Sequence, residues 1–276
     1  MVLRPIMHPS PPAQAGLESP IASQTMTDTE EPLSGGNASQ GVVRVGATVR
    51  KPWTAATPAV HEVMRRVRQA GVDVPEVLGQ DDQGRQVLEM VPGTLAMDSP
   101  PLTHEELARV GRLVRSIHDA TRDLVPDPAV PWENLLPTTG ADLVCHNDLA
   151  PWNLIVGERW VFIDWDGAGP STRLWDLAYA AQSFTINDSR VDAAEAAAGL
   201  AAFIEGYGAD QALRDELPQA LGRRAAAMHE LLRSAHEKGR EPWGTMYTAG
   251  HGAHWLEATR YARAHEETWR LALRGR

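Results

Sequence analysis

The feature that most constrains this chain is a run of polar residues set between two short apolar segments. Residues 142–145 and residues 154–156 are each typical of a short buried strand. Between them lie His146, Asp148 and Asn153, so one loop carries an imidazole, a carboxylate and an amide. In such a strand–loop–strand unit, the two flanking strands position the polar side chains of the loop.

A second carboxylate follows at a defined distance. Residues 160–163 form another apolar segment that ends directly in Asp164, and the turn at Gly157-Glu158 allows pairing with residues 154–156 as a hairpin. This hairpin would bring Asp164 to the same end as the loop that carries Asp148 and Asn153.

The resulting set of groups matches the needs of phosphoryl transfer. One carboxylate, Asp148, is free to accept the proton of an attacking hydroxyl. The amide of Asn153 and the carboxylate of Asp164 are oxygen ligands of the kind that Mg²⁺ prefers. The sequence therefore predicts Asp148 as catalytic base and Asn153 and Asp164 as metal ligands.

Plainer interpretations exist for each residue alone, because Asp and Asn often simply form turns. The joint pattern with its flanking strands favours the chemical interpretation. Asp166 is either a further metal or substrate contact or a solvated loop residue. Grouped with His146, Asp148 and Asp164, it would instead form the metal cluster of a phosphohydrolase.

The chain divides into three parts by composition and periodicity. Residues 1–31 are rich in Pro, Ser, Thr and Ala without a helical or strand period, and we expect a disordered tail. Met26 is a candidate start of translation. Residues 32–92 predict a small β-rich lobe, and residues 93–276 a larger, mainly helical lobe. The expected fold class is thus α+β with two lobes.

Local signals place elements within both lobes. In the first, residues 42–45 and 48–51 predict a hairpin, Thr57-Pro58 predicts a helix start with Thr57 as N-cap, and further strands are expected near residues 76–78 and 86–91. In the second, a capping box opens a helix through about residue 120. Helices follow from about residue 174, with breaks expected near Gly206, Pro218 and residues 241–244.

The overall composition argues against some classes of binding partner and indicates a cellular compartment. The formal net charge of −10 argues against general nucleic-acid binding. No apolar run is long enough to cross a membrane, and the start does not resemble a secretory signal. The single cysteine, Cys145, suits a reducing compartment, so we expect a cytoplasmic protein. Of the 26 lysines and arginines, only Lys51 and Lys238 are lysines, which draws attention to Lys51.

The central motifs resemble those of the aminoglycoside phosphotransferase family, which shares the protein-kinase-like fold with choline and fructosamine kinases. That family carries His-x-Asp-x-x-x-x-Asn, matched by residues 146–153, and an Ile-Asp strand end, matched by Ile163-Asp164. The resemblance implies ATP or GTP with Mg²⁺ as cofactors and the same roles for Asp148, Asn153 and Asp164. It also implies that His146 braces the catalytic loop and that Asp176 is a buried structural residue.

The same resemblance implies a nucleotide site in the first lobe. Lys51 corresponds to the lysine that contacts phosphates, and the glycine-rich turn with Gly36 and Asn37 would place backbone N–H groups over them. The segment Leu88 to Gly93 resembles the hinge between lobes. There the Glu89 carbonyl and the Val91 N–H would bind the adenine edge.

Two departures from the family stand out. Asn147 replaces the usual glycine between the histidine and the aspartate, and Asn tolerates a left-handed backbone better than most residues. Glu62, the nearest candidate partner for Lys51 in the first helix, lies opposite the apolar stripe of that helix. It is therefore expected to point away from the sheet.

The expected activity is transfer of a γ-phosphoryl group to a hydroxyl of a small molecule. By the resemblance, aminoglycosides and other amine-bearing compounds are candidate acceptors, and an acidic surface would favour such a cationic substrate. A kinase-like binding or immunity module without turnover is the main alternative, and a metal-dependent phosphohydrolase is a further one. The sequence does not specify the acceptor, the nucleotide or the oligomeric state.

Overall fold

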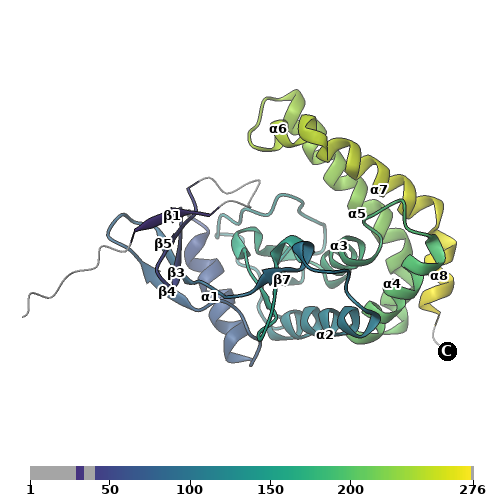
Figure 1. Cartoon of the computed structure of the whole chain (residues 1–276), viewed down its shortest axis with the longest axis horizontal. Coiled ribbons are helices and arrows are strands. Elements are labelled where there is room, and N and C mark those ends of the chain that lie inside the picture. The colour runs from purple at the N-terminus through teal and green to yellow at the C-terminus, as the bar shows by residue number, and fades with distance from the viewer. Residues whose placement is uncertain (1–28, 34–40, 275–276) are drawn as a thin grey trace, which may run out of the picture.

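The computed structural model describes residues 29–33 and 41–274 and shows two lobes, as predicted (Figure 1). The expected tail to residue 28 and the glycine-rich turn at residues 34–40 lie outside these ranges. The first lobe holds an antiparallel sheet of order β1-β2-β3-β5-β4. Its strands are β1 (Glu30–Pro32), β2 (Val43–Val45), β3 (Thr48–Lys51), β4 (Val77–Gln80) and β5 (Gln86–Glu89).

The predicted hairpin is confirmed: β2 and β3 pair antiparallel across a turn in which Gly46 takes a positive φ of 58°. On its other side β3 pairs with β5 in a register that sets Lys51 opposite Gln86. Strand β1 lies across the expected domain boundary, with Glu30 paired to Val45.

Helix α1 (Thr57–Gln69) packs through the predicted apolar stripe. Val63, Met64 and Val67 are almost fully buried. The expected N-cap role of Thr57 is wrong, because the helix already includes this residue and Ala56 precedes it as cap. The Thr57 hydroxyl instead accepts from the Thr54 N–H at 2.9 Å, which stabilises the turn before the helix.

The second lobe is mainly helical. Its helices are α2 (His104–Ala120), α3 (Arg173–Thr185), α4 (Ala193–Tyr207), α5 (Gln211–Glu237), α6 (Trp243–Met246), α7 (Gly252–Ala264) and α8 (Glu266–Leu273), with a π-helical turn at Tyr247–His251. In Figure 1, α5 and α7 run side by side and carry α6 at one end. None of the helices in the described ranges is long and apolar enough to cross a membrane.

Short strands and 3-10 turns connect the helices to the sheet. The strands are β6 (Thr94–Leu95), β7 (Leu143–Cys145), β8 (Leu154–Val156), β9 (Val161–Phe162) and β10 (Gly169–Ser171), and the 3-10 turns span Ala96–Asp98, Pro151–Asn153 and Trp165–Gly167. The predicted hairpin of β8 and β9 is confirmed, and β6 extends it. Strand β10 pairs with β7.

The observed helix boundaries can be compared with the capping box and the breaks that the sequence predicts. The capping box at α2 is confirmed, with Thr103 and Glu106 bonding to each other's backbone N–H groups. The expected break at Pro218 is wrong, since α5 continues through it. Pro218 is buried next to Leu217, so packing offsets the missing N–H. The chain does break between α5 and α6, as predicted.

Glycines allow α2 and α4 to cross closely. A Cβ at Gly111 of α2 would lie 2.1 Å from the Phe203 carbonyl oxygen, and one at Gly206 would lie 2.0 Å from that of Ala108. Gly206 therefore serves packing, and the helix break expected near it is confirmed. The helix ends one residue later, before Gly208 with its positive φ of 70°.

Candidate active site

The loop between β7 and β8 holds Asp148 between two donors. Its Oδ1 accepts from the Tyr179 hydroxyl at 2.7 Å, and its Oδ2 accepts from the Asn153 amide at 2.7 Å. Burial raises the pKa of the Asp148 carboxyl, and the bonds from Tyr179 and Asn153 oppose that rise. A carboxylate with a raised pKa that is fixed from both sides is suited to accept a proton.

His146 lies fully buried behind this loop. Its Nδ1 accepts from the Asp148 N–H at 3.3 Å, and its Nε2 donates to the Ile163 carbonyl at 3.1 Å. Burial lowers the pKa of the His146 imidazole, which favours this neutral form. His146 thus connects the loop to β9 and has both ring nitrogens engaged with the main chain.

Asn147 makes the tight turn between these residues. Its φ of 66° lies in the left-handed region that Asn tolerates. Its side-chain amide donates to the carbonyl oxygens of Gly167 and Gly169 at 3.1 and 3.2 Å. The residue that replaces the family's glycine therefore also ties the loop to the segment after Asp164.

The β8–β9 hairpin brings Asn153 and Asp164 to one end. The Ile163 N–H donates to the Asn153 carbonyl at 2.8 Å, which holds the residues before Asp164 against the loop. Asp164 itself takes a left-handed conformation with a φ of 63°, a cost usually retained where function needs it. The structure thus places together Asp148, Asn153 and Asp164, as expected from their spacing.

Lys51 reaches this site from the first lobe. It is 6% exposed and forms ion pairs with Asp164 and Asp166. Burial lowers the pKa of the Lys51 ammonium, but the two carboxylates more than offset this, so the pKa lies above its ordinary value. The same interaction lowers the pKa of Asp164 against the opposing effect of burial.

The residues fit a divalent cation. The ammonium of Lys51 already lies between two carboxylates, so the site stabilises positive charge. The Asn153 nitrogen donates to Asp148, which leaves the amide oxygen as the atom able to hold a metal. Oxygen ligands of this kind suit Mg²⁺, and Asp164 and Asn153 are the residues that would bind it.

The expected hinge lies where β5 leaves the sheet. Val91 is 3% exposed and packs with Ile155 and Val161. The Glu89 side chain turns toward Arg159 and the Glu76 N–H. Adenine contacts by the Glu89 carbonyl and the Val91 N–H stay a prediction. Gly36 and Asn37 lie outside the described residues.

Glu62 does not pair with Lys51. Its side chain is 70% exposed and contacts Arg65 on the same helix. The helical period correctly predicted this outward direction.

Three buried side chains of the site were missed from the sequence. Tyr179 lies on α3 three residues after Asp176, and this one-turn spacing is the signal that could have indicated it. Arg224 of α5 is 4% exposed and lies over the Tyr179 ring at 4.2 Å. It donates to the Asn147 carbonyl at 3.3 Å, while its Nε and one terminal nitrogen lack partners. Gln86 of β5 bonds to Asp166 at 3.2 Å.

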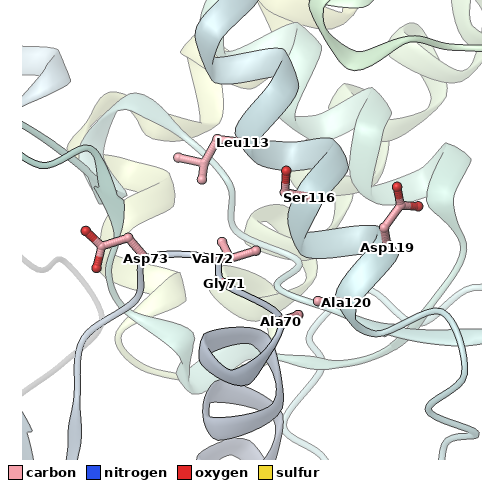
Figure 2. Close-up of a pocket in the computed structure, with 8 residues that line it drawn as sticks. All are labelled: Ala70, Gly71, Val72, Asp73, Leu113, Ser116, Asp119 and Ala120. Atoms are coloured by element: carbon pink, nitrogen blue, oxygen red, sulfur yellow. The ribbon is translucent and has the colours of Figure 1, made fainter.

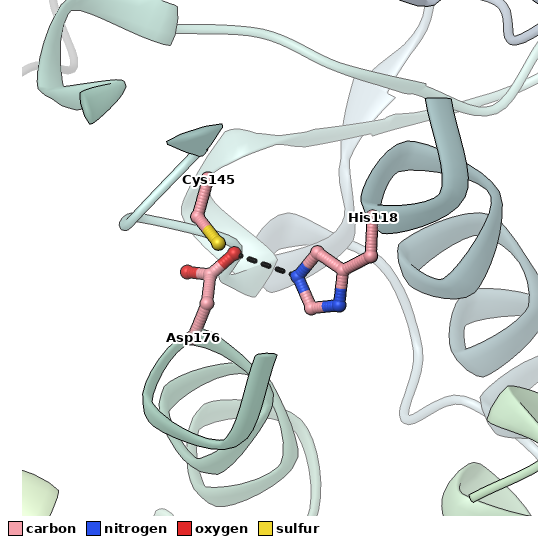
Figure 3. Close-up of side chains that lie close together, drawn as sticks. All are labelled: His118, Cys145 and Asp176. Carbon is pink, nitrogen blue, oxygen red and sulfur yellow. Dashed lines mark hydrogen bonds and ion pairs between the residues drawn. The ribbon is translucent and has the colours of Figure 1, made fainter. Parts of the chain in front are cut away.

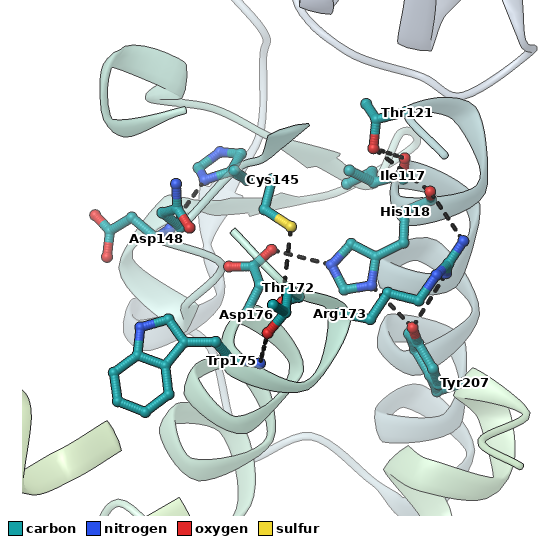
Figure 4. A network of polar contacts seen from close by, with 12 residues as sticks. Ile117, His118, Thr121, Cys145, Asp148, Thr172, Arg173, Trp175, Asp176 and Tyr207 are labelled. Carbon is teal, nitrogen blue, oxygen red and sulfur yellow. Dashed lines mark hydrogen bonds and ion pairs between the residues drawn. The ribbon is translucent and has the colours of Figure 1, made fainter. Parts of the chain in front are cut away.

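A buried network supports the loop from behind. His118 of α2, Cys145 of β7 and Asp176 of α3 point toward one another (Figure 3). His118 bonds to Asp176 at 3.0 Å and to the Tyr207 hydroxyl at 2.9 Å, so it links three helices (Figure 4). The burial of Asp176 within this network agrees with the structural role that the resemblance implies for it.

A groove of about 420 Å³ lies where the end of α1 meets α2 (Figure 2). It contains two carboxylates, Asp73 and Asp119. Both are bound by arginines, Asp73 by Arg159 and Asp119 by Arg115 and Arg173. Neither carboxylate of the groove is therefore without a charged partner.

Comparison with known proteins places this geometry in a family. The profile of the phosphotransferase enzyme family (APH) matches residues 31–133 and 130–217. The trifolitoxin immunity protein of Rhizobium leguminosarum bv. trifolii is 28% identical over 158 residues. That match spans 54% of this chain and 59% of the relative, so the chain matches well under two thirds of that protein's length.

Solved structures share the fold. A choline/ethanolamine kinase family protein from Mesorhizobium loti is similar with a TM-score of 0.55, at 20% identity, covering 91% of this chain and 94% of that one. A microcompartment-associated aminopropanol kinase is similar with a TM-score of 0.57, at 16% identity, covering 84% and 90%. An amicoumacin kinase, hAmiN, gives 0.56 at 14% identity, covering 80% and 81%. With the family profile matching most of residues 31–217, this chain belongs to the phosphotransferase enzyme family.

Proposed function

We propose that this chain transfers the γ-phosphoryl group of ATP or GTP to a hydroxyl group of a small molecule. The observation that carries the proposal is the convergence of Lys51 from strand β3 of the first lobe with Asp148, Asn153 and Asp164 from two loops of the second lobe. Family membership supports nucleotide and divalent-metal use in general.

The chemistry follows from the positions of these residues. Asp148 accepts the proton of the acceptor hydroxyl, and the acceptor oxygen forms a bond to the γ-phosphorus. The bond from that phosphorus to the β–γ bridging oxygen breaks, and the nucleoside diphosphate leaves. Lys51 would contact the phosphates, and a Mg²⁺ ion held by Asn153 and Asp164 would neutralise charge on the phosphate oxygens.

The acceptor would approach Asp148 from the side of α5, α6 and α7. An aromatic cluster extends from Tyr179 in that direction and includes half-buried side chains beside the loop, namely Trp152, Met228, Trp243, Met246 and Tyr247. Aromatic faces of this kind attract an ammonium group. By contrast, the carboxylates Asp188 and Glu230 of the same lobe are each bound by an arginine.

We therefore propose a small amino alcohol as acceptor instead of a large polycation. The names of two similar structures, a choline/ethanolamine kinase family protein and an aminopropanol kinase, support this choice. Trp165 is not available to the acceptor, because its ring is 2% exposed and packs on His146.

The test is mass spectrometry of an acceptor panel incubated with Mg²⁺ and ATP or GTP. The panel contains amino alcohols, choline, sugars and aminoglycosides, and the control is Asp148→Asn. We expect an amino alcohol to gain one phosphoryl group with the wild type only. Phosphorylation of an aminoglycoside alone would contradict the acceptor assignment, and equal product from Asp148→Asn would contradict the mechanism.

A second candidate is a binding or immunity module, which the similarity to the trifolitoxin immunity protein favours. The two functions differ in their need for Asp148. Protection of a trifolitoxin-sensitive strain by the wild type and equally by Asp148→Asn would support the module. The phosphohydrolase alternative lacks its histidine ligand, because both nitrogens of His146 are bonded to main-chain groups.

A further inference from the structure

Lys51 forms its ion pairs with two carboxylates that follow β9 and with none from helix α1. Helix α1 offers it no carboxylate, since Glu62 points outward and contacts Arg65. Both of its ion pairs are instead with residues after β9. Asp164 is the expected metal ligand, and Asp166 lies two residues further, with Oδ2 at 2.5 Å from the Lys51 ammonium.

Asp166 is held on its other side by a buried amide. The Gln86 side chain donates to Asp166 Oδ1 at 3.2 Å and to the Pro52 carbonyl at 3.1 Å. Gln86 is 2% exposed and lies directly opposite Lys51 in the β3–β5 register. Its position across the sheet therefore aligns the carboxylate with the lysine.

The chain of contacts continues to α1. The Gln86 oxygen bonds to His61 Nε2 at 3.1 Å, and His61 is 2% exposed. The Trp53 ring packs edge-on against this imidazole at 5.4 Å. Because buried polar groups need partners, these matched donors and acceptors fix a single arrangement of His61, Gln86 and Asp166.

We propose that Asp166 is the permanent counter-ion of Lys51 and that Gln86 and His61 are the residues that position it. This assignment rests on the proposed phosphotransferase function. The two carboxylates then have different roles. Asp166 keeps Lys51 oriented toward the phosphates, while Asp164 is released to bind the metal. Helix α1 is then coupled to Lys51 through His61 and Gln86 instead of through a glutamate.

The scarcity of lysine allows a direct test that needs neither nucleotide nor turnover. Protein labelled with ¹³C and ¹⁵N in lysine has two lysine side chains, and Lys238→Arg assigns their NMR signals. We expect Asp166→Asn and Gln86→Leu to move the Lys51 signal and Glu62→Gln, the matched carboxylate control, to leave it in place. An unchanged Lys51 signal in Asp166→Asn would overturn the proposal.

The second test separates a counter-ion from a metal ligand. We expect Asp166→Asn to raise the KM for the nucleotide about tenfold, as for loss of one charged hydrogen bond, with little change in kcat. In a double-mutant cycle this loss should vanish in a Lys51→Met background. Asp166→Glu should restore most of the affinity, a rescue that a merely structural defect would not show.

Calorimetry of nucleotide binding at several Mg²⁺ concentrations gives the deciding contrast. The half-saturating Mg²⁺ concentration should rise for Asp164→Asn and stay unchanged for Asp166→Asn. An equal rise in both variants would make Asp166 a metal ligand and refute the counter-ion role. Absence of nucleotide binding by the wild type would instead refute the proposed function, while the NMR result would still stand or fall separately.

Discussion

The hydroxyl of Tyr179 should control the ionisation of Asp148, and Tyr179→Phe isolates it. The substitution removes one oxygen that donates to Asp148 Oδ1 at 2.7 Å and leaves the 2%-exposed ring in place. A hydrogen bond to a charged group contributes about 1.5–3 kcal/mol. That is a factor of about 10 to 100 in favour of the ionised carboxylate.

The direction of the effect follows from the pKa of Asp148. Burial raises this pKa and the Tyr179 bond lowers it, so removing the bond raises it further. A general base works only when deprotonated, and activity falls as pH decreases through its pKa. The acid limb of the kcat profile should therefore move to higher pH, with most of the activity recovered in alkaline buffer.

The assay is phosphoryl transfer measured from acid to alkaline pH for the wild type, Tyr179→Phe and Tyr207→Phe. Tyr207 is the matched control, because this tyrosine is also buried but its hydroxyl bonds to His118. We expect Tyr207→Phe to lower stability and leave the acid limb where it is. An acid limb in Tyr179→Phe that coincides with the wild type, or moves to lower pH, would refute the role of this bond.

Three further outcomes are expected. Asp148→Asn should raise the Tm at neutral pH, because folding raises the pKa of Asp148 and so disfavours its ionised form. Calorimetry should show this gain in Tm disappear below the ordinary pKa of 3.8, where the carboxyl is protonated in both the folded and the unfolded state. Arg224→Met should keep or raise the Tm, since it removes a buried, partly unpaired charge, yet lower kcat by loosening the Asn147 carbonyl; a fall in Tm of several degrees would contradict this. Gly111→Ala should destabilise the protein by about 2–3 kcal/mol in urea unfolding, because its Cβ would meet the Phe203 carbonyl of α4.

Much of the site could be predicted because its parts are close in sequence. The spacing from His146 to Asn153 and the hairpin before Asp164 involve neighbouring strands, and local rules place such residues well. The same holds for the hairpin that carries Lys51 and for the outward direction of Glu62.

Contacts between distant elements were beyond these rules. Tyr179 and Arg224 reach the loop from α3 and α5. The one-turn spacing from Asp176 suggests the face of α3 that carries Tyr179, but no local pattern shows which face of α5 meets the loop. The partners of Lys51 depend on how the two lobes meet. The helical period could therefore argue against Glu62 as a partner of Lys51, but no local pattern identified Asp166 as one. Pro218 shows the related limit that burial can keep a helix intact where a local signal predicts a break.

Asp164 and Asn153 are expected to bind a metal together with the nucleotide, and Asp148 is expected to act only in the transfer step. The most direct measurement is calorimetric titration of ATP, with and without Mg²⁺, into the wild type, Asp164→Asn and Asp148→Asn. We expect Mg²⁺-dependent binding by the wild type, loss of that dependence in Asp164→Asn, and retained binding without phosphoryl transfer in Asp148→Asn. No binding by the wild type at millimolar ATP, or the same Mg²⁺ dependence in Asp164→Asn, would refute these roles.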